Sequence, residues 1–196
     1  MIKRLFDIFF ALLGLIILSP VLLLISVLIK LGSKGPVFYR QTRVGLHGND
    51  FKIFKFRTMY LNSDKKGLLT LGDRDPRITG IGYILRKYKL DEFPQLINVL
   101  IGDMSFVGPR PEVRKYVNLY SKEDLEILTV KPGITDYASI AYRDEAELMK
   151  QSDNPEDLYV KIIMPDKIKL NKLYIKKNNV LTDIKIILKT LVSIIG

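Results

Sequence analysis

Apolar positions open the chain as one unbroken run. Residues Ile8 to Ile29 carry no charge, and a straight helix of these 22 residues would extend about 33 Å, enough to cross a bilayer core. Ser19 and Pro20 interrupt the run at its middle. Pro20 has no N–H to donate and clashes with the carbonyl four residues earlier, whereas the Ser19 hydroxyl can bond a carbonyl in the preceding turn. The pattern predicts two apolar half-helices joined at a break.

Positive charges flank both ends of this run. Lys3 and Arg4 precede it, and Lys30 and Lys34 follow it. The positive-inside rule keeps both flanks in the cytoplasm, and a half-helix of about 11 residues reaches about 17 Å, to mid-bilayer. We therefore predict that residues 1–31 form a re-entrant membrane hairpin, and that residues 32–196 form a cytosolic catalytic domain associated with the membrane. A single helix that spans the membrane with a proline kink is the alternative.

Alternation with a period of two follows the membrane segment. A first strand begins near Val37, and a second covers residues 51–59, so the two predict a β-hairpin. The second strand places Lys55 and Arg57 on one face and Phe54 and Phe56 on the other. Two adjacent cations on a strand suit an anionic ligand, although an edge facing solvent or lipid headgroups would have the same pattern.

Residues 61–80 are polar and rich in turn formers, which predicts a long loop that could close over a site. Asp73 and Asp75 lie in this loop. Their spacing lacks the rest of a calcium-binding motif, so it favours ordinary turn chemistry over a metal site.

Helical spacing of apolar residues at 93, 96, 97 and 100, with Pro94 in a first turn, predicts a helix that begins near Asp91. Asp91 could then be its N-cap and Glu92 a first-turn acid. A carboxylate at a helix N-terminus is also expected to be ionised. It could coordinate a divalent cation or attack phosphorus as a nucleophile.

Three arginines are candidate phosphate ligands. Arg86 lies five residues before Asp91, and Arg110 stands between two prolines that stiffen its backbone. Arg143 follows a Pro-Gly turn and a short aromatic segment. For Arg110 and Arg143, a surface charge without a ligand is the alternative.

Near the C-terminus, apolar residues at 184, 187, 188 and 191 keep helical spacing, and lysines lie off that face. This amphipathic helix could lie on an anionic membrane or pack on the soluble core. Together these elements predict a helix-rich α+β fold with a small β-hairpin, an N-terminal re-entrant helix-break-helix and amphipathic interfacial helices.

Composition narrows the chemistry. The 196 residues are 47% hydrophobic with a net charge of +10, so the chain is folded rather than disordered. The net charge is +7 over residues 1–60 and +6 over residues 161–196, whereas residues 61–160 have a net charge of −3. Basic ends suit nucleic acid, an anionic membrane or a phosphate-rich ligand. The chain has no cysteine and a single histidine, His47, which excludes cysteine nucleophiles and zinc-thiolate sites and disfavours histidine-based catalysis.

The order and spacing of these motifs resemble the monotopic phosphoglycosyl transferases, the bacterial sugar transferase family. The resemblance covers nearly the whole chain, in what looks like the minimal form without an extra N-terminal domain. Its motifs are the basic N-terminus, the Ser-Pro break, the second-strand motif, Arg86 and the stretches 90–96, 102–111 and 131–135.

The resemblance implies transfer of a phosphosugar from a UDP-sugar to polyprenyl phosphate, with release of UMP and with Mg²⁺ as cofactor. Asp91 would be the nucleophile that forms an aspartyl-phosphosugar, and Glu92 its partner in holding the metal or positioning the acceptor. Arg86 and Arg110 would grip phosphates, and Arg57 matches a basic position of the strand motif. The enzyme would be monotopic on the cytoplasmic face of a bacterial inner membrane, in contact with anionic lipids, without nucleic acid, and compatible with a homodimer.

One stretch departs from the family pattern. Residues 136–139 read Asp-Tyr-Ala-Ser, where relatives often have Gly-Trp-Ala-Gln, so the resemblance implies no particular donor sugar. Two rival functions remain open at this point: a membrane-anchored binding module without catalysis, and a magnesium-dependent phosphohydrolase.

Overall fold

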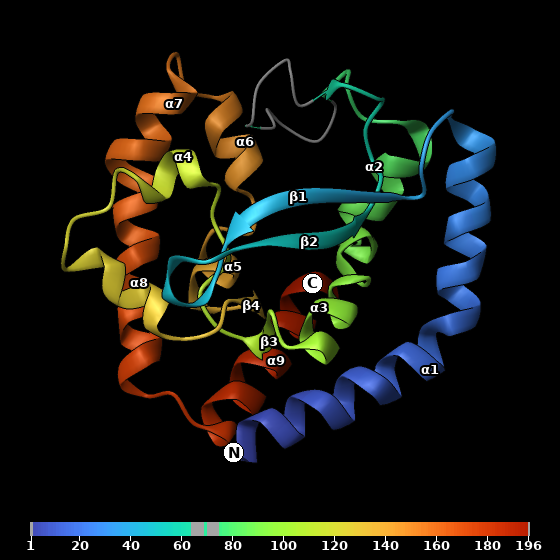
Figure 1. Ribbon diagram of the computed structural model, residues 1–196. Helices are drawn as coiled ribbons and strands as arrows, with labels where there is room; N and C mark the ends of the chain where they lie inside the picture. Colours follow the sequence, from blue (N-terminus) through green and yellow to red (C-terminus); the bar gives the residue numbers. More distant parts are fainter. Residues whose placement is uncertain (1, 64–68, 70–74, 196) are drawn as a thin grey trace.

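The computed structural model describes residues 2–63, 69 and 75–195, and it confirms the predicted helix-rich α+β class (Figure 1). The α-helices are α1 (Ile2–Gly32), α2 (Gly80–Lys87), α3 (Gln95–Ile101), α4 (Arg114–Val117), α5 (Tyr137–Ala141), α6 (Glu145–Lys150), α7 (Pro155–Leu158), α8 (Met164–Lys176) and α9 (Val180–Ile195). Short helical turns are η1 (Leu46–Gly48), η3 (Leu90–Glu92), η4 (Asp124–Thr129) and η5 (Tyr159–Ile163). The strands are β1 (Phe38–Val44), β2 (Asp50–Phe56), β3 (Ser105–Val107) and β4 (Gly133–Thr135).

The apolar N-terminal segment is the single helix α1, which bends midway and then runs up the side of the molecule (Figure 1). Pro20 lies inside it, so the predicted break is a bend within a continuous helix. The Ser19 hydroxyl donates to the Ile16 carbonyl at 2.8 Å, which is the carbonyl that Pro20 leaves without its helical donor. This local compensation is as the sequence predicted. By length and composition α1 could cross a membrane, and only 11% of its most apolar window is buried.

The first half of α1 is tied to the folded body by polar contacts. Lys3 donates to the Val107 carbonyl at 3.1 Å, and Arg4 donates to the Leu100 carbonyl at 2.8 Å. Asp7, which is buried, accepts hydrogen bonds from the Ser105 hydroxyl and from the following backbone N–H.

The second half of α1 contacts the same body through apolar side chains. Ile25 and Ile29 are buried in one cluster with Phe56 of β2 and Leu85 of α2. Both ends of the helix therefore rest on the same folded unit, with the bend between them.

The predicted hairpin is present as the antiparallel pair β1 and β2, in register from Phe38 with Phe56 to Val44 with Asp50. Its second strand ends at Phe56 rather than at residue 59. The buried Asn98 of α3 holds this strand by accepting from the Phe54 N–H at 2.8 Å and donating to the Lys52 carbonyl at 2.9 Å. Asn98 thus replaces a third strand at this edge.

A parallel pair, β3 and β4, brings two distant loops together. Gly108 and Gly133 touch at this point, because a Cβ added to Gly133 would lie 2.1 Å from the Gly108 nitrogen. Only glycine permits this approach. The contact places the segment after Gly108 beside the segment after Gly133.

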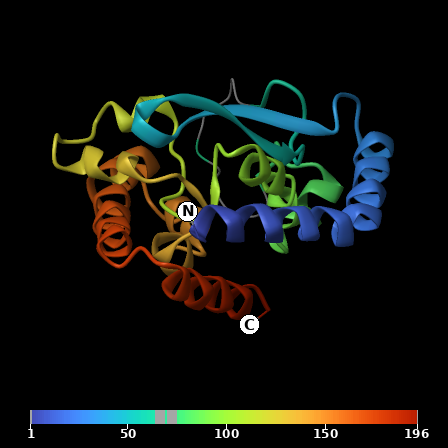
Figure 2. The same ribbon diagram turned by 60° about the horizontal axis from the view of Figure 1, so that its bottom comes forward.

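Helix α9 packs on the folded core with one side and exposes an apolar side that could lie on a membrane, so both alternatives for its sequence apply. Ile186 is fully buried in a cluster with Val107 and Tyr174. Another side of the helix exposes an apolar stripe: Leu181, Ile184, Leu188, Leu191 and Val192. Figure 2 shows α9 on the same side of the molecule as the first half of α1, and the Lys3–Asp183 ion pair joins the starts of the two helices. The exposed apolar residues of both helices are available to a membrane.

Candidate active site

A cavity of about 610 Å³ lies between the hairpin, the loops after β3 and β4, and helices α1, α2, α6 and α9. Charged side chains predicted as site residues gather in its lining: Lys55, Arg86, Asp91, Glu92, Arg110 and Arg143. The chain therefore brings together residues that are up to 88 positions apart in sequence. Arg57 is the one predicted ligand that does not line this cavity.

The segment that carries the two carboxylates is a tight turn and not the start of a regular helix. Helix α2 ends before Lys89, whose φ of 55° reverses the chain in the left-handed region. Residues 90–92 then form the turn η3, and α3 starts only at Gln95. The regular helix begins four residues later than predicted, and the alternative that Asp91 is its N-cap is wrong. Because Pro94 has no N–H to donate, it separates the turn from the helix.

The two carboxylates have different partners. Glu92 accepts a hydrogen bond from Lys55 at 2.9 Å and from Arg110, whose Nη1 lies at 3.0 Å and whose Nη2 also contacts the carboxylate. Asp91 is 8% exposed, and within the described ranges its carboxylate accepts no hydrogen bond. Glu92 is fixed, whereas Asp91 is buried and unengaged beside it.

The electrostatics separate the two carboxylates further. Burial opposes ionisation of Glu92, but Arg110 and Lys55 outweigh it and hold the pKa of Glu92 well below its usual value. Burial raises the pKa of Asp91, and the neighbouring Glu92 charge adds to this, while Lys55 and Arg86 oppose it. The expected support from a helix N-terminus is missing, because the regular helix α3 begins only at Gln95. Asp91 is a carboxylate whose ionised form is poorly stabilised by its surroundings.

Arg110 reaches Glu92 from the loop after β3. Its backbone N–H donates to the fully buried Asp136 at 2.9 Å, and Asp136 also accepts from the Ser139 N–H at the start of α5. Asp136 thus fixes the arginine's position. The sequence marked this aspartate only as a departure from the family pattern, and nothing there indicated its contact with residue 110.

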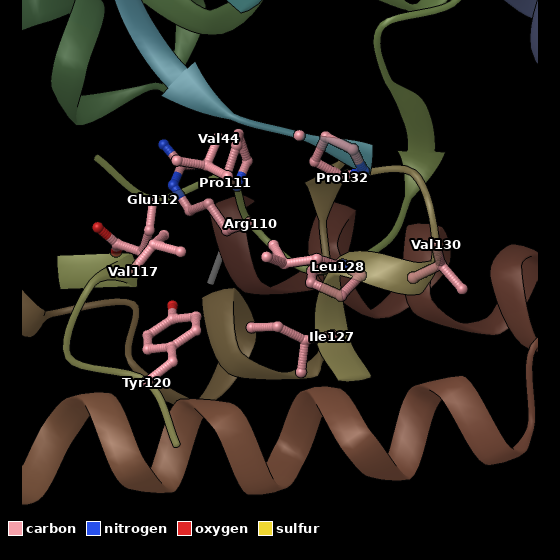
Figure 3. A pocket seen from close by; sticks show the side chains of 12 residues that line it. Val44, Arg110, Pro111, Glu112, Val117, Tyr120, Ile127, Leu128, Val130 and Pro132 are labelled. Atoms are coloured by element: carbon pink, nitrogen blue, oxygen red, sulfur yellow. The ribbon is translucent and has the colours of Figure 1, made fainter. Parts of the chain in front are cut away.

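Apolar packing also supports the loop that carries Arg110. Figure 3 shows the small pocket that borders it, lined mainly by apolar side chains such as Pro111, Ile127 and Leu128. The loop that carries Arg110 is therefore anchored by packing as well as by hydrogen bonds.

The remaining arginines fall into two groups. Arg86, in the last turn of α2, and Arg143, after α5, both line the cavity, and in the described part of the chain neither side chain has a hydrogen-bond partner. Arg57 is buried and donates to the carbonyls of Ser33, at 2.9 Å, and Lys34. Its position corrects the prediction of a phosphate ligand: Arg57 binds the chain that leaves α1.

A second polar group in the cavity was missed by sequence reasoning. Arg43 of β1 donates to the Pro111 carbonyl at 3.0 Å and pairs with Glu112 at 3.8 Å, and Glu112 also accepts from the Tyr159 hydroxyl. Arg43, Glu112 and Tyr159 lie 47 to 116 positions apart, so no spacing pattern in the sequence linked them.

Over residues 2–63, 69 and 75–195, no group of three or more His, Asp or Glu side chains is placed to hold a metal. Asp73 of the polar loop lies outside the described residues. Asp75 pairs with Arg77 at 2.6 Å and accepts its backbone N–H, as expected for turn chemistry.

Comparisons with known proteins find relatives that match nearly the whole chain. The chain is 38% identical over 197 residues to the UDP-N-acetylgalactosamine-undecaprenyl-phosphate N-acetylgalactosaminephosphotransferase of Aeromonas hydrophila, covering 99% of this chain and 44% of that protein. It is 38% identical over 194 residues to the UDP-glucose:undecaprenyl-phosphate glucose-1-phosphate transferase of Escherichia coli K12, covering 97% and 39%. The exopolysaccharide production protein ExoY of Sinorhizobium fredii is 34% identical over 208 residues, covering 98% and 84%.

The chain therefore spans about two fifths of the length of the first two relatives. The family model described as bacterial sugar transferase matches residues 1–196, which is the whole of this sequence. By that match, and by relatives more than 30% identical over nearly its full length, the chain belongs to the bacterial sugar transferase family.

Proposed function

We propose that this protein transfers a sugar 1-phosphate from a UDP-sugar to polyprenyl phosphate, with UMP as the other product, at the start of polysaccharide or glycoconjugate assembly. The names of its relatives describe transferases of this kind and a protein of exopolysaccharide production. The observation that carries the proposal is the contrast between Glu92, held by Lys55 and Arg110, and the unengaged Asp91 beside it.

The first step uses Asp91 as a nucleophile. A carboxylate oxygen of Asp91 attacks the β-phosphorus of the donor, the bond from that phosphorus to the bridging oxygen breaks, and UMP leaves with the bonding electron pair. In the second step a phosphate oxygen of the acceptor attacks the same phosphorus, and the Asp91–phosphorus bond breaks. An unpartnered carboxylate suits this role, because a nucleophile with no hydrogen bonds loses none when it attacks.

The surrounding cations suit a diphosphate. Phosphoryl transfer depends on positioning and on neutralising charge more than on acid–base groups. Arg86 and Arg143 line the cavity with uncommitted guanidinium groups, which bind phosphate oxygens in pairs. Lys55 and Arg110 add charge next to Asp91, although Glu92 already neutralises part of it.

Mg²⁺ is part of the proposal, and the residues fit it. Magnesium is usually held by one or two carboxylates together with substrate phosphates. Asp91 offers free oxygens and would hold the ion with the donor diphosphate, and the adjacent Glu92 would add a ligand through a lone pair that Lys55 and Arg110 do not use. When bound, it would supply further neutralisation of phosphate charge.

For topology we propose a monotopic protein on the cytoplasmic face of the inner membrane, in contact with anionic lipids. Both ends of α1 rest on the same folded body: Lys3 and Arg4 at one end, Ile25 and Ile29 at the other. This arrangement supports a helix that enters and leaves the bilayer on one side. A homodimer stays a prediction.

The test is intact-mass spectrometry of the purified protein incubated with UDP-sugars and Mg²⁺ in the absence of acceptor. We expect an adduct with the mass of a sugar phosphate, mapped to the peptide that contains Asp91 and lost when polyprenyl phosphate is added. Steady release of sugar phosphate into water without acceptor would instead identify a phosphohydrolase. No adduct and no turnover across a broad donor panel would favour a binding module.

A further inference from the structure

Apolar residues of two helices contribute to the lining of the cavity that contains Asp91. They are Phe10, Gly14 and Leu18 of α1, and Ile187 and Leu191 of α9. The same cavity is lined by the charged groups around Asp91, which we call its phosphate end. Such a cavity fits a ligand with an anionic head and an apolar tail.

The α1 wall is a single stripe of the helix. Residues 10, 14 and 18 recur every four positions and so share one face, which ends directly before the Ser19–Pro20 bend. Gly14 has a specific role in this stripe, because a Cβ there would lie 3.2 Å from the Leu96 side chain of α3. Its missing side chain lets α1 lie close to α3, while Phe10 remains 43% exposed.

The α9 wall adjoins the phosphate end. The Thr190 hydroxyl lies 2.6 Å from the Thr135 hydroxyl at the end of β4. The neighbouring Ile134 carbonyl accepts from Arg110 at 3.4 Å. A molecule lying along Leu191 would therefore have its head near Arg110.

We propose that the groove between α1 and α9, formed by Phe10, Leu18, Ile187 and Leu191, holds the first isoprene units of the polyprenyl phosphate acceptor, which enters sideways from the membrane. The inference rests on the proposed function and extends it to a binding site. Both helices that border the groove expose apolar residues on the same side of the molecule, so the acceptor reaches Asp91 without its tail crossing water. The phosphate end of the same cavity accounts for the headgroup.

A matched pair of leucines on α9 tests the groove. Leu191 and Leu188 are 52% and 57% exposed, but only Leu191 lines the cavity. We expect Leu191→Gln to raise the KM for undecaprenyl phosphate about tenfold, the effect of about 1.4 kcal/mol, and Leu188→Gln to change it less than about twofold. Adduct formation from the UDP-sugar uses no acceptor, so a wild-type rate of adduct formation in each variant would show that its donor site is intact. Equal effects of the two substitutions, or none from Leu191→Gln, would overturn the proposal.

A second experiment needs no substitution. A polyprenyl phosphate with a photoreactive group in its first isoprene units is added to wild-type protein in phosphatidylglycerol vesicles and irradiated. We expect the label on residues 10–18 and 187–191, displaced by undecaprenyl phosphate and not by added phosphatidylglycerol. Labels confined to other elements, or equal displacement by phosphatidylglycerol, would contradict the acceptor groove.

The two experiments also separate this inference from the covalent mechanism. If wild-type protein forms no aspartyl adduct but labels the groove specifically, the nucleophile assignment fails and the acceptor site stands. If the adduct forms normally and the label falls elsewhere, the acceptor site fails and the assignment of Asp91 stands.

Discussion

Arg110 holds Glu92 by a two-point ion pair, with its two terminal nitrogens directed at the two carboxylate oxygens. This pair joins the loop after β3 to the turn η3, and Lys55 of the hairpin completes it from the other side. The three side chains form a rigid frame around Asp91, which takes no hydrogen bond from them in the described structure. The proposed mechanism therefore gives positioning to Glu92 and the reaction to Asp91.

Replacement of Asp91 by Asn tests the reactive carboxylate. The amide keeps the shape but is not a nucleophile toward phosphorus, so we expect turnover to fall at least about 100-fold and the covalent adduct to disappear. Radiolabelled transfer from UDP-sugar to polyprenyl phosphate measures this. Asp144→Asn, at an exposed position that does not line the cavity, is the matched control and should stay near wild type. Near-normal turnover by the Asp91 variant would rule the nucleophile out.

The same Asp91→Asn substitution should stabilise the fold. The pKa of Asp91 is raised in the folded protein, chiefly by burial, so its folded state binds a proton more tightly than the unfolded chain does. Stability linked to this group is present below its unfolded pKa and is lost as pH rises through the folded pKa.

At pH 7.5 the wild-type protein has to bury the charged form of Asp91, whereas the Asn variant buries a neutral amide. We therefore expect the free energy of unfolding of the variant to be about 1 kcal/mol higher than that of the wild type. Thermal unfolding in one detergent at pH 7.5 and at pH 4 measures it, and the difference between the proteins should shrink at the lower pH. A variant less stable than wild type at pH 7.5 would contradict the burial argument.

Two arginines that look alike in sequence should respond differently to alanine. Arg57→Ala removes a buried guanidinium from the carbonyls of Ser33 and Lys34, so we expect a loss of about 2 kcal/mol in stability. Arg86→Ala removes a half-exposed cavity cation without a hydrogen-bond partner in the described residues. We expect a stability change within about 0.5 kcal/mol and a KM for UDP-sugar raised about tenfold. Denaturant titration and donor kinetics on both variants separate the roles, and the reverse pattern would show them misassigned.

These arginines also show which parts of the site could be predicted from the sequence. Motif order placed Arg86 and Arg110 near Asp91, and periodicity predicted the hairpin, because both signals are local or shared by a family. The partner of Arg57 is the backbone beyond α1, 23 positions away, and the partners of Glu92 lie 37 and 18 positions away. Such contacts depend on packing, which no spacing rule encodes. The start of α3 differs from the prediction for a local reason, since the turn η3 and Pro94 precede Gln95.

The topology of α1 is open to direct labelling, because the chain contains no cysteine. Ile2 and Leu31 lie near the two ends of the helix and are 76% and 80% exposed, so either can be replaced by cysteine with little effect on packing. In sealed vesicles we expect a membrane-impermeant maleimide to reach both positions from the same side. Reaction from opposite sides would mean that the helix spans the bilayer.

Pro20→Ala should weaken this arrangement. Alanine restores the N–H that the Ile16 carbonyl lacks, which favours a straight helix. Straightening draws Ile25 and Ile29 away from Phe56 and Leu85, so we expect lower transferase activity and labelling of part of the Leu31→Cys population from the opposite side. Val21→Ala, at the next position and 42% exposed, is the control and should label as wild type does. If Pro20→Ala leaves both activity and labelling unchanged, the contacts at the two ends of α1, and not the proline, are sufficient to hold the bend.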